Sequence, residues 1–445
     1  MSSTDSSSSL YVKIIRLGLP ILIGQLGSIV VGFADTMMVG HYSTASLASA
    51  SFVNNLFNVA LFASLGFSYG LTPLVGSLFS RRKHDEIGRL TRSALIVNLL
   101  FLCLLAAVMA TLYFNLERLG QPEELLPIIR PYFLIVMGGM LPLTLFNVFS
   151  QWSYAINRTR LPMWIILGAN VMNIAGNYAL IYGHWGLPEL GLVGAGIATV
   201  AARTFAAVTL MAVFFLRRDF RPYRRGFLEG RMTRGDFRLI NVKSWPVALQ
   251  MVFESGSFTA AAVMAGWLGT IELAAFQIIV IVGQLGFCLY YSIAAAVSVL
   301  VSNAAGLADR LLMRRTARAG YLIMLAVATG SSLFFALGSH QLMPLFSDDP
   351  AVVSMAITLI FPLVLYQYGD ATQITFANAL RGTADVMPMM WISFISYVIV
   401  GLPVTYLLAF PCGMGLYGLI LSFSASLFLA AALFLRYFLR ATRPA

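Results

Sequence analysis

The stretch FPLVLYQYGDATQITFANALRG, residues 361–382, decides the fold class, because it is apolar enough for a membrane yet carries an acid near its middle. That acid is Asp370, and Tyr366 and Gln373 share its face of a helix. An ionised carboxylate at the centre of a bilayer costs about 2.5–3.5 kcal/mol, so it is tolerated where it faces a polar cavity or binds a cation. The alternative is a buried acid that neighbouring hydroxyl and amide groups satisfy.

Apolar runs of this kind recur along the whole chain. Of its 445 residues, 59% are hydrophobic and 11% are charged, whereas about 25% of the residues of a soluble domain are charged. The runs are continuous and long enough to cross a bilayer, so the sequence predicts an all-α polytopic membrane protein with twelve transmembrane helices. The predicted segments cover about 10–39, 45–76, 93–115, 131–156, 161–183, 190–216, 240–268, 273–304, 316–340, 351–380, 387–410 and 414–438.

The basic residues gather on one side of these segments. All but three of the 29 lysine and arginine residues lie near the termini and in alternate loops, the exceptions being Arg118, Arg130 and Arg203. This is the positive-inside pattern, which predicts that both termini are cytoplasmic. The net charge of +11 therefore indicates topology and contact with anionic lipid, and we expect no nucleic-acid partner. The Ser-rich N-terminus shows no cleavage site of a signal peptide.

Two halves of the chain resemble each other. MVGHYSTASLASAS from Met38 aligns without a gap with MAGWLGTIELAAFQ from Met264, and GLVGAGIA from Gly191 aligns with GLYGLILS from Gly415. Parallel repeats of this kind predict two pseudo-symmetric six-helix lobes with a cleft between them. We expect an N-terminal lobe of residues 1–216, a cytoplasmic linker of residues 217–239 and a C-terminal lobe of residues 240–445.

Polar residues of the first half predict one cation site. Asp35 lies late in the first helix, Asn173 and Asn177 lie one turn apart in the fifth, and Thr199 lies in the sixth. Their carboxylate, amide and hydroxyl oxygens suit a hard cation such as Na⁺, and a carboxylate alone suffices for a proton. Hydrogen bonding between helices is an equally good interpretation of the asparagines and the threonine. Pro20 is expected to bend the first helix or to loosen its hydrogen bonds.

The second half carries a second acidic site. Glu254 follows Gln250 by one turn in the seventh helix, and together with Asp370 and Tyr366 it would bind a cation. Aromatic faces nearby suit an organic cation, although most of these rings are core or lipid-facing residues in such a chain. The expected lining of a substrate cavity is Gln250, Phe253, Gln284, Phe287, Tyr290 and Gln373.

Other chemistries find little support in the sequence. Three scattered cysteines and four scattered histidines form no metal-binding or disulfide motif, and the phosphate-binding GxxxxGK[ST] motif of ATPases is absent. Arg203 is the one deep cation, and pairing with Asp35, lining the cavity and reaching the membrane surface all remain open for it. Asp348 and Asp349 are interpreted as solvated residues or helix caps. We therefore expect a transporter without a cofactor, and not an enzyme.

These stretches resemble the multidrug and toxic compound extrusion (MATE) transporters, in particular the NorM-like branch. The resemblance covers nearly the whole chain and rests on GQLGSIVVGFADTMMVGHYSTASLASAS, NIAGNYALIYGHWGLPELGLVGAGIAT and YQYGDATQITFANALRG followed by GLPVTYLLAF. It implies a twelve-helix MATE/MOP-type fold that exports organic, often cationic compounds in exchange for Na⁺ or H⁺. By matching positions, the cation-coupling residues would be Asp35, Asn173, Asn177, Thr199, Glu254, Tyr366 and Asp370, and Pro20 matches a proline at which the first helix bends in some members.

One residue departs from the family pattern, because members that use a first-lobe site often have aspartate where Asn177 stands. The coupling ion thus stays open, with Na⁺ at Glu254, Asp370 or Asp35 as the metal that the resemblance implies. We expect a monomer in a bacterial inner membrane. The alternatives are a lipid-linked precursor flippase of the same fold, which three embedded acids against one arginine disfavour, a major-facilitator carrier, and an intramembrane transferase, for which DDxxD-type motifs are missing.

Overall fold

Helices make up every regular element that the computed structural model describes, in residues 7–119, 122–347 and 349–443. The first six residues of the Ser-rich start and Asp348 lie outside the described residues. Asp349 caps α13 (Pro350–Thr358), since its side chain accepts a hydrogen bond from the backbone nitrogen of Ala351 at 2.9 Å. The expectation of a capping role is thus confirmed for Asp349.

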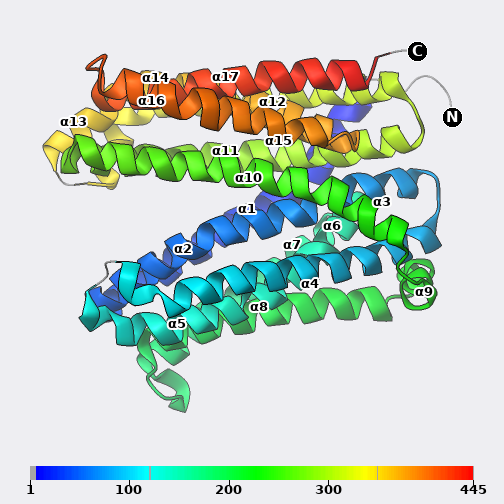
Figure 1. Cartoon of the computed structure of the whole chain (residues 1–445), viewed down its shortest axis with the longest axis horizontal. Coiled ribbons are helices and arrows are strands. Elements are labelled where there is room, and N and C mark those ends of the chain that lie inside the picture. Colours follow the sequence, from blue (N-terminus) through cyan, green and yellow to red (C-terminus); the bar gives the residue numbers. More distant parts are fainter. Residues whose placement is uncertain (1–6, 120–121, 348, 444–445) are drawn as a thin grey trace. The chain divides into compact units, whose positions relative to one another are not determined.

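The predicted number of membrane spans is confirmed. In the described part of the chain, eleven helical runs are long and apolar enough to cross a membrane, and a twelfth span is formed if a bent pair of helices counts as one. The pair is α13 and α14 (Ile360–Gly382), which meet at 50° (Figure 1). The stretch that carries Asp370 is therefore the longer piece of a broken span.

Proline determines where three of the spans break. A proline cannot donate a hydrogen bond to the carbonyl four residues earlier, and its ring clashes with that carbonyl. One helix ends at Tyr69 ahead of Pro73, another at Gly138 ahead of Pro142, and α13 ends at Thr358 ahead of Pro362, always with a spacing of four. The second and third of these breaks lie in the fourth span of each half, as a repeat predicts.

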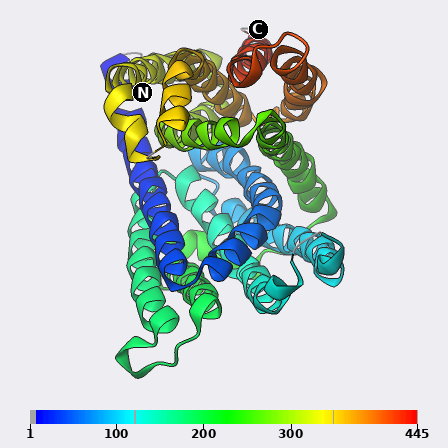
Figure 2. The ribbon, with the colours of Figure 1, turned by 90° about the vertical axis from the view of Figure 1, so that its left-hand side faces the viewer.

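Two other prolines leave their helices unbroken. The first helix, α1 (Ser7–Tyr42), is one continuous helix across Pro20, seen along its length in dark blue in Figure 2. The helix α10 (Arg234–Leu268) likewise continues through Pro246. Pro20 and Pro246 differ by 226 in number, the same offset as the repeat between Met38 and Met264.

The chain divides into two compact units, and both divisions fall inside long helices. One unit comprises Ile23–Ala248, and the other comprises the residues up to Leu22 and from Leu249 onward. The first unit holds the later part of α1, the start of α10 and eight complete helices: α2 (Thr44–Tyr69), α3 (Leu71–Ser80), α4 (His84–Phe114), α5 (Leu126–Gly138), α6 (Met140–Ala155), α7 (Arg160–Tyr182), α8 (Gly191–Leu216) and α9 (Arg221–Glu229). Its core includes Phe57 and Phe133, whose rings meet edge to face at 4.8 Å.

The second unit contains most of α10 and the remaining helices. Besides α13 and α14 these are α11 (Thr270–Gly306), α12 (Arg310–Leu342), α15 (Met387–Ser393), a π-helical segment (Phe394–Gly401), α16 (Leu402–Ala409) and α17 (Gly415–Ala441). Phe258 and Phe423 stack at 4.9 Å in its core. The π-helical segment includes Ile399, four residues before Pro403, so proline disturbs this span as well.

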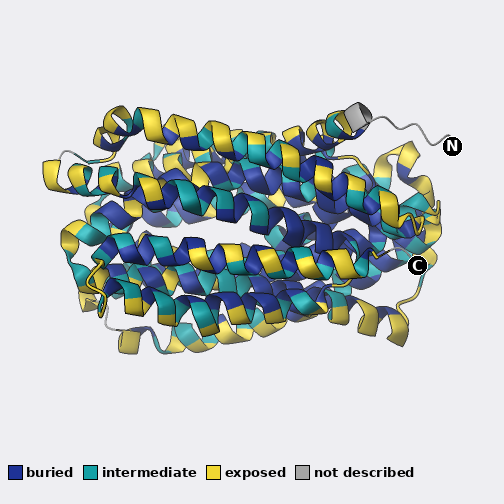
Figure 3. Ribbon diagram, turned by 90° about the horizontal axis from the view of Figure 1, so that it is seen from above, coloured by how far each residue is buried: buried dark blue, intermediate teal, exposed yellow. Residues whose placement is uncertain are grey.

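The outer faces of the helices are apolar. Phe114, Trp164 and Leu337 are among the most exposed large hydrophobic side chains, and Figure 3 shows exposed residues along the outer sides of the helices. Because lipid tails are as apolar as these side chains, exposure of this kind is expected for a membrane protein and helix contacts rely on close packing.

The segment between α8 and α10 is docked on α4. Gly226 of α9 and Gly88 of α4 make the close approach possible, because a Cβ at either glycine would lie about 2 Å from a carbonyl oxygen of the opposite helix, at 2.0 Å and 1.9 Å respectively. Arg92 donates to the carbonyl oxygens of Phe227, Leu228 and Gly230 at 3.3, 3.1 and 2.9 Å, which caps the end of α9.

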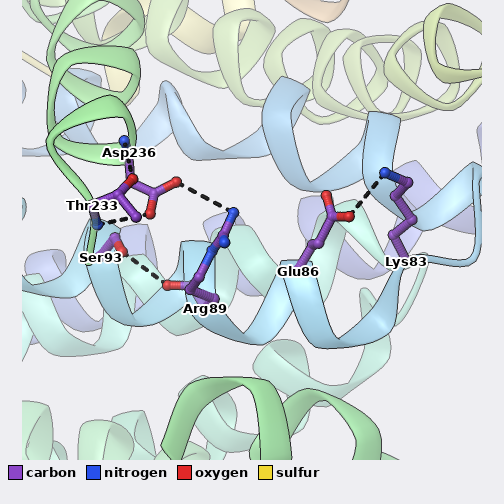
Figure 4. Close-up of polar contacts among 6 residues, drawn as sticks. All are labelled: Lys83, Glu86, Arg89, Ser93, Thr233 and Asp236. Carbon is purple, nitrogen blue, oxygen red and sulfur yellow. Dashed lines mark hydrogen bonds and ion pairs between the residues drawn. The ribbon is translucent and has the colours of Figure 1, made fainter. Parts of the chain in front are cut away.

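The start of α10 is fixed to the same helix. The side chains of Thr233 and Asp236 cap each other's backbone nitrogens at 3.0 Å, and Asp236 pairs with Arg89 of α4 at 3.6 Å (Figure 4). Lys83 and Glu86 pair nearby at 2.8 Å. The segment is therefore held by packing, a cap and an ion pair.

Replacing Gly226 by alanine should loosen this segment. The added methyl group overlaps the carbonyl of Asp85, and overpacking of this kind costs about 1–3 kcal/mol. We expect a lower melting temperature in detergent and faster trypsin cleavage within residues 217–233. Gly235→Ala is the control, because its Cβ would meet Thr233 Oγ1 at an ordinary 3.5 Å. Equal melting temperatures and equal cleavage rates for the two variants would contradict the prediction.

Candidate functional site

The polar residues of the first unit form one hydrogen-bonded chain. Asn177 donates from Nδ2 to Asp35 and also to Asn173 Oδ1, the latter at 3.3 Å. Asn173 in turn donates to Thr199 Oγ1 at 3.1 Å, and Thr199 donates to the carbonyl of Ala195 at 3.0 Å. Helices α1, α7 and α8 thus bring together the four residues that the sequence groups, with both asparagines buried.

Arg203 lies beside this chain. Its guanidinium reaches the break between α5 and α6, where a Cβ on Gly139 would lie 3.3 Å from Nη1. Arg203 interacts electrostatically with Asp35 and with Tyr132, although no ion pair shorter than 4 Å joins Arg203 to Asp35 among the described residues. Of the three roles open for this residue, the geometry favours compensation of the Asp35 charge.

The acids of the second unit interact electrostatically with each other. Asp370 on α14 is only 2% exposed, and its Oδ2 atom has no hydrogen-bond partner among the described residues. Glu254 on α10 is half-buried and interacts electrostatically with Asp370. The side chain of Gln250 lies one turn before Glu254 and interacts with that carboxylate. One buried carboxylate oxygen is therefore left unpaired within the electrostatic reach of a second carboxylate.

Two tyrosines interact with these acids, and one of them, Tyr366, is predicted from the sequence. Tyr366 lies one turn before Asp370 and interacts electrostatically with both acids. Tyr397, from the π-helical segment, is buried and does the same, while its hydroxyl has no hydrogen-bond partner in the described structure. Pro403 is the signal in the sequence that could have pointed to Tyr397. A proline disturbs the helix ahead of it, and π-helical segments frequently occur at functional sites.

One sequence assignment is wrong. The charge pattern of the sequence counts Arg381 among the loop residues. In the structure it occupies the last turn of α14 and is only 5% exposed. It donates to Asn378 Oδ1 at 3.0 Å and interacts electrostatically with Glu254. Gly382 explains the burial, because it packs so closely on α11 that a Cβ would lie 2.7 Å from the carbonyl oxygen of Ser298. The embedded acids of the chain thus have two buried or half-buried arginines nearby.

The residues predicted to line a substrate cavity differ in their burial and in their neighbours. Gln373 is buried near Asp370, with its Oε1 unpaired among the described residues. Tyr290 is fully buried, bonds to Ser331 at 2.7 Å and interacts electrostatically with Asp370. Phe253 packs on Phe394 at 5.2 Å, and Phe287 stacks on Tyr291 at 5.8 Å. In contrast to the buried Gln373 and Tyr290, Gln284 is exposed.

The chemistry available at both sites is cation binding. No group of three or more His, Cys, Asp or Glu residues that suits a transition metal occurs in the described part of the chain. The first unit offers one carboxylate with amide and hydroxyl groups, and the second offers two carboxylates with two tyrosines and Gln250. Such oxygen-rich sets suit a hard monovalent cation, or a proton shared by the two carboxylates.

Family comparison identifies the family of the chain. The sequence model described as MatE matches residues 20–179 and 246–407, which make up most of the chain and include nearly all of the predicted coupling residues. The chain belongs to the MatE family. Thr199 is the predicted coupling residue that falls between the two matched ranges. The resemblance noted in the sequence is thus confirmed, and the family consists of transporters rather than enzymes.

Relatives of this MatE chain are similar over nearly its whole length. "Probable multidrug resistance protein NorM" of Geobacillus kaustophilus is 29% identical over 444 residues, which cover 99% of this chain and 97% of that protein. A protein of the same name from Bradyrhizobium diazoefficiens is 30% identical, with 95% and 92% covered.

Solved structures agree with the fold. The Vibrio cholerae MATE transporter VcmN in its bent form matches with a TM-score of 0.86 at 17% identity, covering 98% of each chain. A MOP superfamily transporter from Pyrococcus furiosus matches with a TM-score of 0.88 at 17% identity, covering all of both chains. The predicted MATE/MOP-type fold is therefore confirmed.

Proposed function

We propose that this MatE chain is an ion-coupled multidrug exporter in which Asp370 and Glu254 bind the coupling cation, Na⁺ or H⁺. The observation that carries the proposal is the buried Asp370 oxygen, which has no hydrogen-bond partner among the described residues and whose carboxylate interacts electrostatically with Glu254. An unpaired buried charge is costly, and a cation or a proton removes that cost. The names of the relatives, probable multidrug resistance proteins, support drugs as the exported compounds.

The acids of the two sites differ in the groups that surround their charge. Asp35 accepts a hydrogen bond from Asn177 and has Arg203 as a nearby cation, whereas Asp370 has an acid as its charged neighbour. Arg381 interacts with Glu254, so the second site has two carboxylates for one arginine, whereas the first has one carboxylate for one arginine. The second site therefore keeps an excess negative charge and binds the coupling ion more tightly. The first site then serves a supporting role in the same cycle.

The remaining features follow the sequence expectations. The protein works as a monomer in a bacterial inner membrane with both termini in the cytoplasm, and its outer surface contacts the lipid bilayer. Residues 1–216 and 240–445 act as the two lobes around the linker 217–239. Organic cations bind against aromatic faces such as Phe253, Phe287 and Tyr290, and ion binding drives the exchange between inward- and outward-open states.

Reconstitution in liposomes tests the proposal. The purified chain is inserted in vesicles, and ethidium transport is followed under a sodium gradient alone, under a proton gradient alone and under no gradient. Dye movement against its own gradient in one ion condition is expected, and no movement in either would refute the exporter. Membrane potential adds about 2.3 kcal/mol per charge per 100 mV, so it is held at zero with valinomycin and equal potassium.

Replacing Asp35 by asparagine should have a small effect on ion-driven export. The substitution keeps the volume and the acceptor for Asn177 and removes only the charge that Arg203 compensates. We expect the initial rate to fall by at most about threefold, less than the tenfold that 1.4 kcal/mol represents. The measurement is ethidium transport in the same liposomes at equal protein content. A rate at the background level would instead assign ion coupling to the first unit.

A further inference from the structure

A groove at one end of the second unit combines four arginines with an apolar floor. It has a volume of about 520 Å³ and lies between the beginning of α12 and the end of α17. Ala432, Leu435 and Leu439 form its apolar part, and its charged lining is supplied by Arg314, Arg436, Arg440 and Arg443. None of the described residues that line it is an acid.

The groove is built by helix geometry. On α17 the lining positions follow the spacing of one helical face, so the arginines and the leucines alternate along a single stripe. Arg314 is held against this stripe, because it donates to Thr442 Oγ1 at 3.1 Å and to the carbonyl of Leu439 at 2.9 Å. Arg310 of α12 also donates to the carbonyl of Arg443, at 2.5 Å. These hydrogen bonds hold the end of α17 and the residues after it against α12.

The charge of the groove is not met within the described protein. Arg436, Arg440 and Arg443 are exposed and take part in none of the ion pairs among the described residues. Asp309, the acid at the start of α12, is used to cap that helix, since it accepts from the backbone nitrogen of Leu312 at 2.9 Å. Three guanidinium groups therefore face the surroundings on a part of the molecule where two membrane-spanning helices end.

We propose that this groove binds the head group of an anionic phospholipid of the surrounding leaflet. Guanidinium forks match phosphate oxygens in geometry and charge, and basic pockets at the ends of transmembrane helices suit such head groups. The apolar floor distinguishes a lipid from a soluble phosphate, because Leu435 and Leu439 give the first methylene groups of an acyl chain a dry surface. This lipid site is independent of ion coupling.

Lipid binding to the purified protein tests the proposal. Native mass spectrometry in detergent would compare phosphatidylglycerol with phosphatidylcholine, and inorganic phosphate would be added in a separate arm. The variant Arg436→Gln/Arg440→Gln should bind phosphatidylglycerol about 25-fold more weakly, about fivefold for each arginine removed near an anionic lipid. Arg315→Gln/Arg318→Gln is the matched control, since both residues are exposed on α12 outside the groove, and its affinity should equal that of the unchanged chain.

A lysine variant tests whether charge or structure is lost, and three outcomes would contradict the proposal. Arg436→Lys/Arg440→Lys should recover most of the affinity, because lysine still binds phosphate as a point charge; recovery also shows that the glutamine variant lost charge rather than structure. Equal weakening by the groove and control variants would overturn the proposal. So would equal binding of phosphatidylcholine and phosphatidylglycerol, or inorganic phosphate displacing the lipid at equal concentration.

Discussion

Replacing Asp370 by asparagine should lower ion-driven drug export at least tenfold while the protein stays folded. The side chain is 2% exposed and its Oδ2 atom has no partner in the described structure. A unit charge about 4 Å from a cation is worth about 4 kcal/mol at an effective permittivity of about 20. That is nearly three powers of ten in ion affinity at about 1.4 kcal/mol per tenfold. Without that differential binding the ion cannot shift the transport equilibrium.

The same substitution should leave stability unchanged or raised. Asparagine has nearly the volume of aspartate, and it removes a buried charge whose charged neighbour is another acid, Glu254. Export of ethidium or a fluoroquinolone from cells is measured at equal expression, together with the melting temperature of the purified protein. The control is Asp385→Asn, since Asp385 is an exposed acid just beyond the end of α14. Undiminished export by Asp370→Asn would remove this carboxylate from the mechanism.

Much of the fold can be read from the sequence because membrane spans are long, apolar and locally encoded. The breaks are also encoded, since the helices end four residues ahead of Pro73, Pro142 and Pro362. The continuity of α1 across Pro20 is not encoded in this way, because the same residue type breaks one helix and is accommodated in another. The neighbours of each helix decide which outcome occurs.

The candidate sites are predictable only in part for a related reason. Asn173 and Asn177 share a helix face at one-turn spacing, so their meeting with Asp35 and Thr199 follows from the order of the spans. The burial of Arg381 depends instead on the contact of Gly382 with α11. The approach of Tyr397 to the two acids depends on the packing of a distant segment. Contacts of this kind are set by tertiary structure and leave no pattern in a single sequence.

Replacing Glu254 by glutamine should lower sodium-driven export strongly and proton-driven export only weakly. Sodium needs several oxygen ligands at once, and the substitution replaces a carboxylate, with its two oxygens and its charge, by an amide that offers one neutral oxygen. A proton needs one carboxylate, so Asp370 alone still binds it. We expect the sodium-driven rate to fall at least about tenfold, which a loss of about 1.4 kcal/mol of ion binding suffices to produce. The liposome assay with separate gradients measures both rates.

Unlike Asp370→Asn, this substitution should also destabilise the protein, because Glu254 interacts with the buried Arg381. Loss of one partner of a fully buried ion pair costs about 3–5 kcal/mol, and the half-exposure of Glu254 makes the expected cost a fraction of that value. The double variant Glu254→Gln/Arg381→Gln should therefore melt at a higher temperature than Glu254→Gln while its sodium-driven export stays low. If the double variant regained sodium-driven export, Glu254 would act only as the counter-charge of Arg381, and the two carboxylates would not share the ion.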